Sequence, residues 1–306
     1  MKSRRYLTVF TPAYNRAHTI KRTYDSLCRQ TSKDFEWLII DDGSSDGTKK
    51  MVEDWITEAK IPIRYIYQDN QGMHGAHNTA IDNLNNTVLA VCIDSDDWMP
   101  DDAVEKIINF WKKSGDDTYA GIIGLDVNER GDIIGDRLPA TNSLKLHDYY
   151  KNGGKGDKKI VVRTDLLKHY PKYPQFRGEK YFSLGYKYHL INQTYDFVVL
   201  NEPLAIVEYQ LDGSSHSMWK QYWNNPNGFM FLRLEYMRLY ESDTKLQLSS
   251  TIHYISHCIR AKKYLNVFKS PHPLASIILA PIGLSLFCYN WWMVLRNKRM
   301  QLKIQR

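Results

Sequence analysis

Short apolar runs alternate with amphipathic stretches along the first third of the chain. The apolar, β-favouring runs each predict a buried strand, and they cover residues 6–11, 35–40, 63–68 and 88–93. Apolar positions at helical spacing predict helices at 17–30, 48–58 and 102–113. This alternation predicts an α/β fold with a mostly parallel central sheet, right-handed crossovers and helices on both faces. Further strands are expected within 119–135 and 195–209, two in each segment.

The fourth apolar run ends abruptly in an acidic cluster. Asp94, Asp96 and Asp97 follow it, with Ser95 as the neutral residue among them. Three carboxylates this close repel one another unless a positive group lies between them, and a divalent metal that carries an anionic ligand is such a group. Open α/β sheets bind ligands at the carboxyl ends of their strands, which is where this cluster falls. A solvated acidic turn that caps the next helix is the alternative interpretation.

The second apolar run also ends in acid, at Asp41 and Asp42. Because two adjacent carboxylates repel each other, one interpretation is that they accept hydrogen bonds from a base or a ribose. The alternative is an Asx turn, with residues 44–46 capping the helix that begins near Thr48.

The composition is that of an ordinary globular protein with excess positive charge. Of the 306 residues, 43% are hydrophobic and 25% are charged, and the net charge is +7. Positive charge favours anionic partners such as nucleotides or phospholipid surfaces, and without an arginine-rich tract or zinc-ligand spacing nucleic acid is the weakest of these. The four cysteines form no CxxC pair, which predicts a reducing compartment, and the N-terminal residues include no apolar run of the signal-peptide type.

Four motifs, in order along the chain, carry a resemblance to a known family. They are TPAYNR at 11–16, IIDDGSSDGT at 39–48, GMHGAHNTA at 72–80 and VCIDSDD at 91–97. Together they resemble the inverting family 2 glycosyltransferases of GT-A fold, over residues 5–110. The resemblance implies transfer of a sugar from a nucleotide-diphosphate donor, usually a UDP-sugar, with Mg²⁺ or Mn²⁺ as cofactor.

The resemblance also implies a role for each matching position. The residues that it places on the nucleotide-sugar are Thr11, Pro12, Ala13, Tyr14, Asp42, His74, His77, Asn78, Asp94 and Ser95. Tyr14 would lie against the uracil, and Asp42 would accept a hydrogen bond from its N3–H. His77 stands where many members carry a basic residue near the diphosphate.

The expected metal ligands are Asp96, Asp94 and His216. Asp96 would hold the metal that bridges the diphosphate, Asp94 would face the ribose or the metal, and Asp97 would begin the next turn. The physical reason is that the UDP leaving group gains negative charge as the glycosidic bond breaks, and a metal with basic groups stabilises that charge.

A loop rich in glycine, serine and asparagine is expected over residues 210–229. In this fold the corresponding loop often closes over the donor, so His216 would reach the diphosphate or complete the metal shell. A simple solvated loop is the alternative. Trp219, Tyr222 and Trp223 would either form a sugar-stacking wall or simply pack together.

An inverting transfer also needs a carboxylate that takes the proton of the acceptor hydroxyl. The family normally has this acid at the start of a helix, at the position that is Leu184 here. Glu179, in the GEK segment, is our first candidate for the catalytic base, and Asp157 is the second. An ion pair of Glu179 with Arg177 or Lys180 is the alternative.

The last quarter of the chain predicts a helical region that docks on a membrane. Residues 229–264 have apolar positions at helical spacing, and residues 273–295 contain no charge. That length would span a bilayer, but proline, glycine and asparagine interrupt a simple span. Trp291 and Trp292 are of the type that settles at a membrane interface, and the basic tail suits anionic headgroups. We expect an in-plane or re-entrant element; a buried helical hairpin or an oligomer interface is the alternative.

Three regions follow from these patterns. Residues 1–115 would bind the nucleotide-sugar, 116–225 would bind the acceptor and carry catalysis, and 226–306 would form the helical region. The predicted function is transfer of a hexosyl or N-acetylhexosaminyl group from a UDP-sugar to a hydroxyl of a lipid-linked glycan. The setting would be bacterial surface-polysaccharide assembly at the cytoplasmic face of the membrane, as a peripheral or monotopic protein.

Two other functions compete with this prediction. Because Leu184 occupies the usual position of the acid, the chain would alternatively be an inactive homologue that binds nucleotide-sugar and serves as a partner subunit. A nucleotidyl transferase shares the parallel sheet and the metal carboxylates. It usually has a glycine-rich basic loop after the first strand, which TPAYNR lacks.

Overall fold

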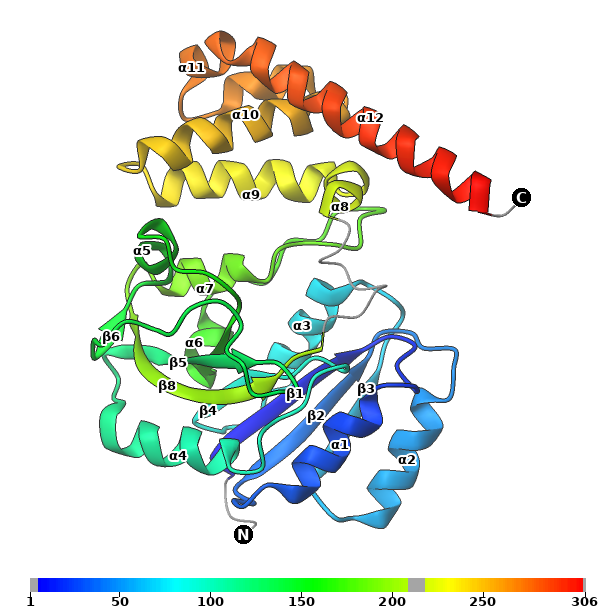
Figure 1. Cartoon of the computed structure of the whole chain (residues 1–306), viewed down its shortest axis with the longest axis vertical. Helices are drawn as coiled ribbons and strands as arrows, with labels where there is room; N and C mark the ends of the chain where they lie inside the picture. Colours follow the sequence, from blue (N-terminus) through cyan, green and yellow to red (C-terminus); the bar gives the residue numbers. More distant parts are fainter. Residues whose placement is uncertain (1–4, 209–217, 305–306) are drawn as a thin grey trace. The chain divides into compact units, whose positions relative to one another are not determined.

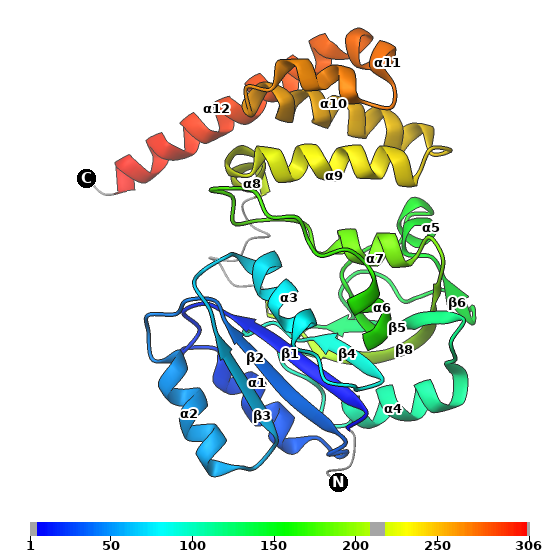
Figure 2. The ribbon, with the colours of Figure 1, turned by 180° about the vertical axis from the view of Figure 1, so that it is seen from behind.

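The computed structural model describes residues 5–208 and 218–304, and the chain divides into two compact units. An α/β unit comprises 1–173 with 184–210, and a helical unit comprises 174–183 with 211–306. Figures 1 and 2 show the two units from opposite sides. A single sheet runs through both of the halves that we expected within residues 1–225.

The sheet of the α/β unit has the strand order β3-β2-β1-β4-β7-β5-β8-β6 (Figure 1). The strands are β1 Leu7–Ala13, β2 Phe35–Asp41, β3 Ile63–Tyr67, β4 Leu89–Cys92, β5 Tyr119–Val127, β6 Ser143–Leu144, β7 Lys158–Arg163 and β8 Asp196–Ile206. The first four strands are parallel to one another, as are β5 and β8. β7 is antiparallel to β4 and β5, and β6 is antiparallel to β8. The mostly parallel sheet expected from the sequence is therefore confirmed.

Helices cover both faces of this sheet (Figures 1 and 2). They are α1 Ile20–Arg29, α2 Thr48–Glu58, α3 Met73–Asp82, α4 Ala103–Ser114, α5 Leu146–Lys151, α6 Thr164–His169 and α7 Gly185–Ile191. On one face, Ile20 of α1 and Ile107 of α4 share a core with Val9. Successive side chains of a strand point to opposite faces, so the next residue, Phe10, lies against α3, with its ring 5.2 Å from that of His77.

A buried lysine fastens α7 to the end of α6. The side chain of Lys187 is fully buried, and its Nζ donates to the carbonyl oxygens of Leu167 at 3.2 Å and Tyr170 at 3.3 Å. These acceptors belong to the C-terminal turn of α6 and the residue after it, where helical carbonyls lack intrahelical partners. Burial lowers the pKa of Lys187 to about 8.

Two of the expected strand pairs differ in the structure. Within 119–135, β5 forms, but its return is a single bridge between Val127 and Ile133. Within 195–209, the two expected strands are one continuous strand, β8, whose register against β5 shifts beside Pro203. Proline cannot donate to the ladder, so the strand continues past it through a local irregularity and does not end there.

The helical unit contains α8 Met218–Asn224, α9 Pro226–Leu239, α10 Thr244–Arg260, the 3₁₀ helix η2 Tyr264–Lys269, α11 Pro273–Ile278 and α12 Ala280–Ile304. The charge-free stretch begins with α11 and continues into α12. α12 continues through Gly283 without a break. A Cβ at this position would come within 2.6 Å of Ile255, so the glycine permits close packing of α12 on α10. Within the described ranges, no helix is both long and apolar enough to cross a membrane.

Candidate active site

The carboxyl ends of β2, β1 and β4 lie next to one another. β1 pairs in parallel with both neighbours, with Ala13 opposite Asp41 and Phe10 opposite Cys92. The backbone N–H of Asp42 donates to the carbonyl of Ala13 at 2.8 Å. Three of the four sequence motifs therefore meet at one edge of the sheet, and this edge is where open α/β sheets bind ligands.

Asp42 joins the remaining motif, GMHGAHNTA at 72–80, to this edge. Its buried carboxylate accepts hydrogen bonds from the backbone N–H of Gln71 and of Gly72, both at 2.8 Å, and from Nε2 of Gln68 at 2.6 Å. Gly72 is the residue before α3 and has a φ of 82°, a conformation that glycine adopts without strain. Asp42 thus positions the first turn of α3, and its predicted contact with the uracil stays a prediction.

The neighbouring acids form the local turn that we considered as the alternative for this motif. Asp41 accepts from the backbone N–H of Ser44 at 2.8 Å and from the Tyr65 hydroxyl at 2.6 Å. Asp46 accepts from the backbone N–H of Thr48, the first residue of α2, at 2.9 Å. Asp41 and Asp46 therefore have structural contacts, as Asp42 does.

At the end of β1, the predicted donor residues point in different directions. The Oγ1 of Thr11 is buried and accepts from Nε1 of Trp37 at 2.9 Å, so this side chain faces the core and not a ligand. Pro12 and Ala13 are buried as well. Tyr14 is 51% exposed, so of these four residues it is the one whose ring is accessible to a base.

The predicted donor residues of α3 are buried. The His77 ring lies edge-on to Phe10 and to Tyr173, at centroid distances of 5.2 and 5.9 Å. Burial lowers the pKa of His77 to about 4, so the imidazole is neutral at pH 7 and does not supply the positive charge implied by the resemblance. His74 is buried too, and Asn78 pairs with the backbone of Tyr173 through hydrogen bonds of 2.9 and 2.8 Å.

The acidic cluster after β4 alternates in exposure. Asp94 and Asp96 are partly exposed, whereas Ser95 and Asp97 are buried. Burial raises the pKa of Asp97 to about 8; Lys159 opposes this, and Asp94 and Asp96 add to it. The two accessible carboxylates therefore add negative charge around Asp97, which we expected to begin the next turn and which is buried.

Two charged residues behind this cluster were missed by the sequence analysis. Asp126 of β5 is buried, and Lys159 of β7, whose side chain is 12% exposed, has its Nζ 3.7 Å from Oδ1 of Asp126. Burial raises the pKa of Asp126, and Lys159 opposes that shift. A single carboxylate inside the apolar run of β5 was the available signal, since such a group is rarely buried without a partner. Asp157 also contributes charge here, because it raises the pKa of Asp126.

The donor set at β4 fits a metal that is shared with a diphosphate. Among the described residues, no three side chains of His, Cys, Asp or Glu converge as a metal cage would require. Mg²⁺ at nucleotide sites needs only one or two carboxylates, because phosphates and water complete its shell. Asp94 and Asp96 supply such carboxylates, and each adds to the raised pKa of Asp97, of which burial is the main cause. The third expected ligand, His216, lies outside the described residues.

Glu179 has contacts that we did not anticipate. It belongs to the helical unit, and its carboxylate accepts from Asn227 N at 2.8 Å, Asn227 Nδ2 at 2.7 Å and Gly228 N at 2.8 Å. Asn227 and Gly228 lie in the first turn of α9, so Glu179 caps that helix and stabilises its positive end. These contacts weigh against its assignment as the catalytic base. Leu184, at the position usual for the acid, immediately precedes α7.

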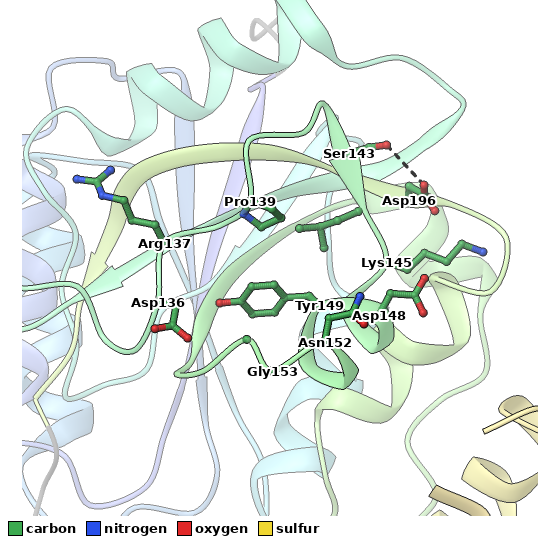
Figure 3. A pocket seen from close by; sticks show the side chains of 12 residues that line it. Asp136, Arg137, Pro139, Ser143, Lys145, Asp148, Tyr149, Asn152, Gly153 and Asp196 are labelled. Carbon is green, nitrogen blue, oxygen red and sulfur yellow. Dashed lines mark hydrogen bonds between the residues drawn. The ribbon is translucent and has the colours of Figure 1, made fainter. Parts of the chain in front are cut away.

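A cavity of about 620 Å³ lies in the half of the α/β unit where we expected the acceptor (Figure 3). It is lined by β6, α5, the preceding loop and the start of β8, and its lining residues include Asp136, Asp148 and Asp196 together with Tyr149. Carboxylates are hydrogen-bond acceptors for sugar hydroxyls. None of the predicted donor residues lines this cavity. The cavity is therefore separate from the sheet edge at the carboxyl ends of β2, β1 and β4, which we call the donor edge.

Comparison with known proteins identifies the family. The model of glycosyl transferase family 2 matches residues 8–170, which is more than half of the chain. The chain therefore belongs to glycosyl transferase family 2, as the four motifs implied.

Its relatives include larger enzymes and one of comparable size. The glycosyltransferase GlyA of Streptococcus pneumoniae is 34% identical over 33% of this chain, and chondroitin synthase of Escherichia coli is 31% identical over 42%. These matches cover only 14% and 18% of the two relatives. The E. coli UDP-Glc:α-D-GlcNAc-diphosphoundecaprenol β-1,3-glucosyltransferase WfgD is 27% identical over 58% of this chain and 67% of its own length.

Solved structures with the same fold come from bacteria and archaea. TarS residues 1–349 of S. aureus in complex with UDP-GlcNAc has a TM-score of 0.60 at 17% identity, covering 93% of this chain and 81% of that one. A mannosyltransferase of Pyrobaculum calidifontis in complex with GDP-Man and Mn²⁺ has a TM-score of 0.56 at 16% identity, covering 97% and 85%. These likenesses support the GT-A fold.

Proposed function

We propose that this chain is an inverting glycosyltransferase that moves a sugar from a UDP-sugar to a hydroxyl of a lipid-linked glycan in surface-polysaccharide assembly. The observation that carries the proposal is the meeting of Tyr14, Asp42 and the Asp94–Asp96 pair at one sheet edge, in a chain of family 2. The lipid-linked acceptor is suggested by WfgD, whose name specifies UDP-Glc and a diphosphoundecaprenol acceptor.

Each residue of the donor edge would have a separate role in binding the UDP-sugar. The exposed ring of Tyr14 would stack on the uracil, and Asp42 would hold the α3 loop against the nucleotide. The first turn of α3 would face the diphosphate, because helix N-termini favour anions. Asp94 and Asp96 would hold Mg²⁺ or Mn²⁺, which supplies positive charge to the departing diphosphate when bound.

The base that takes the proton of the acceptor hydroxyl has two candidates. Glu179 was the first, but three hydrogen bonds engage its carboxylate in capping α9. Asp157 is an exposed carboxylate of the α/β unit, and its charge, like that of Asp94, raises the pKa of the buried Asp126. These observations favour Asp157. A base so placed would remove the proton while the hydroxyl attacks the sugar from the face opposite the leaving group.

The helical unit would hold the enzyme on the cytoplasmic face of a membrane as a peripheral or monotopic protein. Its exposed apolar residues include Leu265 at 78%, Ile278 at 76% and Leu274 at 75%, and Trp291 and Trp292 of α12 are each half exposed. Such residues bury themselves at a bilayer interface, and tryptophan prefers that depth. With a net charge of +7, the chain suits anionic lipids.

A partner subunit without catalytic activity is the second candidate function. It is favoured by Leu184, which occupies the usual position of the acid before α7, and by the capping contacts that engage the carboxylate of Glu179. Such a protein would bind UDP-sugar at the same donor edge without transferring the sugar.

One experiment separates the two functions. The purified chain is given Mn²⁺, a panel of UDP-sugars and a lipid-diphosphate-linked acceptor sugar, and both UDP release and UDP-sugar binding are measured. Acceptor-dependent UDP release supports the transferase. Binding of a UDP-sugar without UDP release supports the inactive subunit. If no UDP-sugar binds, both proposals fail.

A further inference from the structure

Four nitrogen-bearing side chains gather inside the helical unit without an acidic partner. Arg233 lies on α9, and His253, His257 and Arg260 lie on one face of α10 at spacings of four and three residues. The two histidine rings stack with centroids 6.2 Å apart. Arg233 lies close enough to lower the pKa of both histidines, although burial is the larger cause.

Each of these four side chains has a buried nitrogen that lacks a hydrogen-bond partner within the described part of the chain. The atoms are Nε of Arg233, Nδ1 of His253, Nε2 of His257 and Nε of Arg260. His257 is almost fully buried, with an exposed fraction of 2%. An arginine Nε–H can only donate, so two of these atoms require an acceptor. Buried donors without acceptors are costly and rare in native proteins, which points to an absent ligand.

The charge of the cluster specifies what that ligand is. Among the ion pairs of the described residues, the helical unit has one between Arg238 and Glu235, and none involves Arg233 or Arg260. Two guanidinium groups with no carboxylate partner require an anion for compensation. Guanidinium groups match the oxygens of phosphate through forked donors, and a neutral histidine adds a further donor.

Aromatic stacking links the cluster to the helix proposed to lie on the membrane. The guanidinium of Arg260 lies 4.3 Å from the ring centroid of Trp223. On α12, Phe287 stacks on the same Trp223 at 5.7 Å. Tyr222 and Phe229 pack against His257 at 5.7 and 5.4 Å. Tyr222 and Trp223 therefore pack against the cluster, as in the packing alternative that we gave for these aromatic residues.

We propose that Arg233, His253, His257 and Arg260 form a binding site for a phosphate group. The acceptor diphosphate and an anionic lipid headgroup both carry this chemistry. The choice of the acceptor diphosphate as the source rests on the proposed function, whereas the site itself does not.

The first test uses the full chain, inorganic pyrophosphate and EDTA, which removes any metal-dependent binding at the donor edge. Calorimetry is expected to give one binding site per chain and a higher melting temperature with pyrophosphate. In Arg233→Met and Arg260→Met, binding should be at least tenfold weaker. Because an unpaired buried charge is removed, the melting temperature of these variants without ligand should equal or exceed that of the parent chain.

Arg238→Met is the matched control, because Arg238 lies on the same helix, is 60% exposed and pairs with Glu235. It should bind pyrophosphate as the parent does. If a variant fails to fold, Arg233→Lys keeps the charge and should retain part of the binding. Failure of the parent chain to bind pyrophosphate, or equal binding by parent and folded methionine variants, would overturn the proposal.

The second test distinguishes the source of the phosphate. For an acceptor diphosphate, Arg260→Met should raise the KM for the lipid-diphosphate acceptor at least tenfold and leave UDP binding in Mn²⁺ unchanged. For a headgroup, the same variant should lose binding to phosphatidylglycerol vesicles but keep its KM. Both outcomes support the site. If the parent chain does not bind UDP, this result contradicts only the proposed function, since pyrophosphate binding is measured separately.

Discussion

The carboxylate of Glu179 accepts a hydrogen bond of 2.8 Å from the backbone N–H of Gly228, in the first turn of α9. The residue before that helix, Asn225, accepts in return from the backbone N–H groups of Lys180 and Tyr181 at 2.9 and 3.0 Å. The segment and the helix start therefore satisfy each other's polar groups. This exchange explains why residues 174–183 belong to the helical unit although they interrupt the α/β unit in sequence.

The capping contacts predict that Glu179→Gln affects stability more than catalysis. An amide loses charge at the helix start and presents donors to N–H groups, so the free energy of unfolding should fall by about 1 kcal/mol. Turnover of the donor should stay within about threefold of the parent value. Urea denaturation and UDP release measure the two effects.

The companion variant Asp157→Asn should show the opposite pattern. Loss of a general base should lower kcat by about 100-fold, with the melting temperature unchanged because the side chain is exposed. A large loss of kcat in Glu179→Gln, together with normal activity in Asp157→Asn, would restore Glu179 as the base.

The metal role of Asp96 predicts a specific defect in Asp96→Asn. The amide is a weaker ligand, so the Mn²⁺ concentration for half-maximal activity should rise and kcat should fall by about 100-fold. Mn²⁺ titrations of UDP release provide the measurement. Asp101→Asn is the control, since Asp101 is exposed and pairs with Arg29 at 3.0 Å. Identical Mn²⁺ dependence in Asp96→Asn and the parent would exclude the metal role.

Asp42→Asn should weaken nucleotide binding through the α3 loop. The amide nitrogen would face backbone N–H donors of Gln71 or Gly72, leaving a buried donor unsatisfied. The Kd for UDP should rise about tenfold, which corresponds to about 1.4 kcal/mol. Calorimetry measures it, with Asp69→Asn as the control because Asp69 is an exposed residue of the same loop. An unchanged Kd would separate Asp42 from the nucleotide.

Lys187 predicts a pH dependence of stability. Its pKa is lowered by burial from the ordinary 10.5 to about 8. Between these values the unfolded chain binds more protons than the folded one, so this residue makes stability rise with pH from about 8 towards 10. At pH 7 the lysine is charged in both states, and the folded state has the cost of burying that charge.

The variant Lys187→Met should therefore lose the rise in stability between pH 8 and 10 that the parent shows. Urea denaturation at pH 7, 8, 9 and 10 compares the two proteins. Lys113→Met is the control, because Lys113 lies exposed on α4 and should leave the pH profile unchanged. Parallel profiles of Lys187→Met and the parent would show that the lysine titrates normally.

Exposed apolar residues of the helical unit predict binding to anionic vesicles. Ile278→Glu and Trp291→Glu remove interfacial side chains and add negative charge, so each should reduce sedimentation with phosphatidylglycerol vesicles several-fold. Ile56→Glu is the control, since Ile56 is an exposed apolar residue of α2 in the α/β unit. Donor turnover should be unchanged in all three variants. If Ile278→Glu and Trp291→Glu bind vesicles as well as Ile56→Glu and the parent do, the docking role is contradicted.

The apolar runs of the first hundred residues predicted the strands and helices closely. The helix expected at 48–58 is α2, with those same bounds, and the charged ends of β2 and β4 meet as the parallel arrangement required. Period-2 and period-3.6 patterns are local properties, so a single sequence reveals them. The acidic cluster after β4 was found for the same reason, because its residues are adjacent in the chain.

What only the tertiary structure decided is the direction and environment of individual side chains. Thr11 faces Trp37, His77 is buried and neutral, and Glu179 caps a helix 47 residues further along the chain, at Pro226. Lys159 and Asp126 pair across two strands, and four basic side chains of α9 and α10 gather without an acid. Burial and hydrogen bonding between distant residues set these properties, and neither is encoded in local spacing. The sequence thus determined the fold and the edge of the sheet where the donor is expected, and the packing decided which residues are available there.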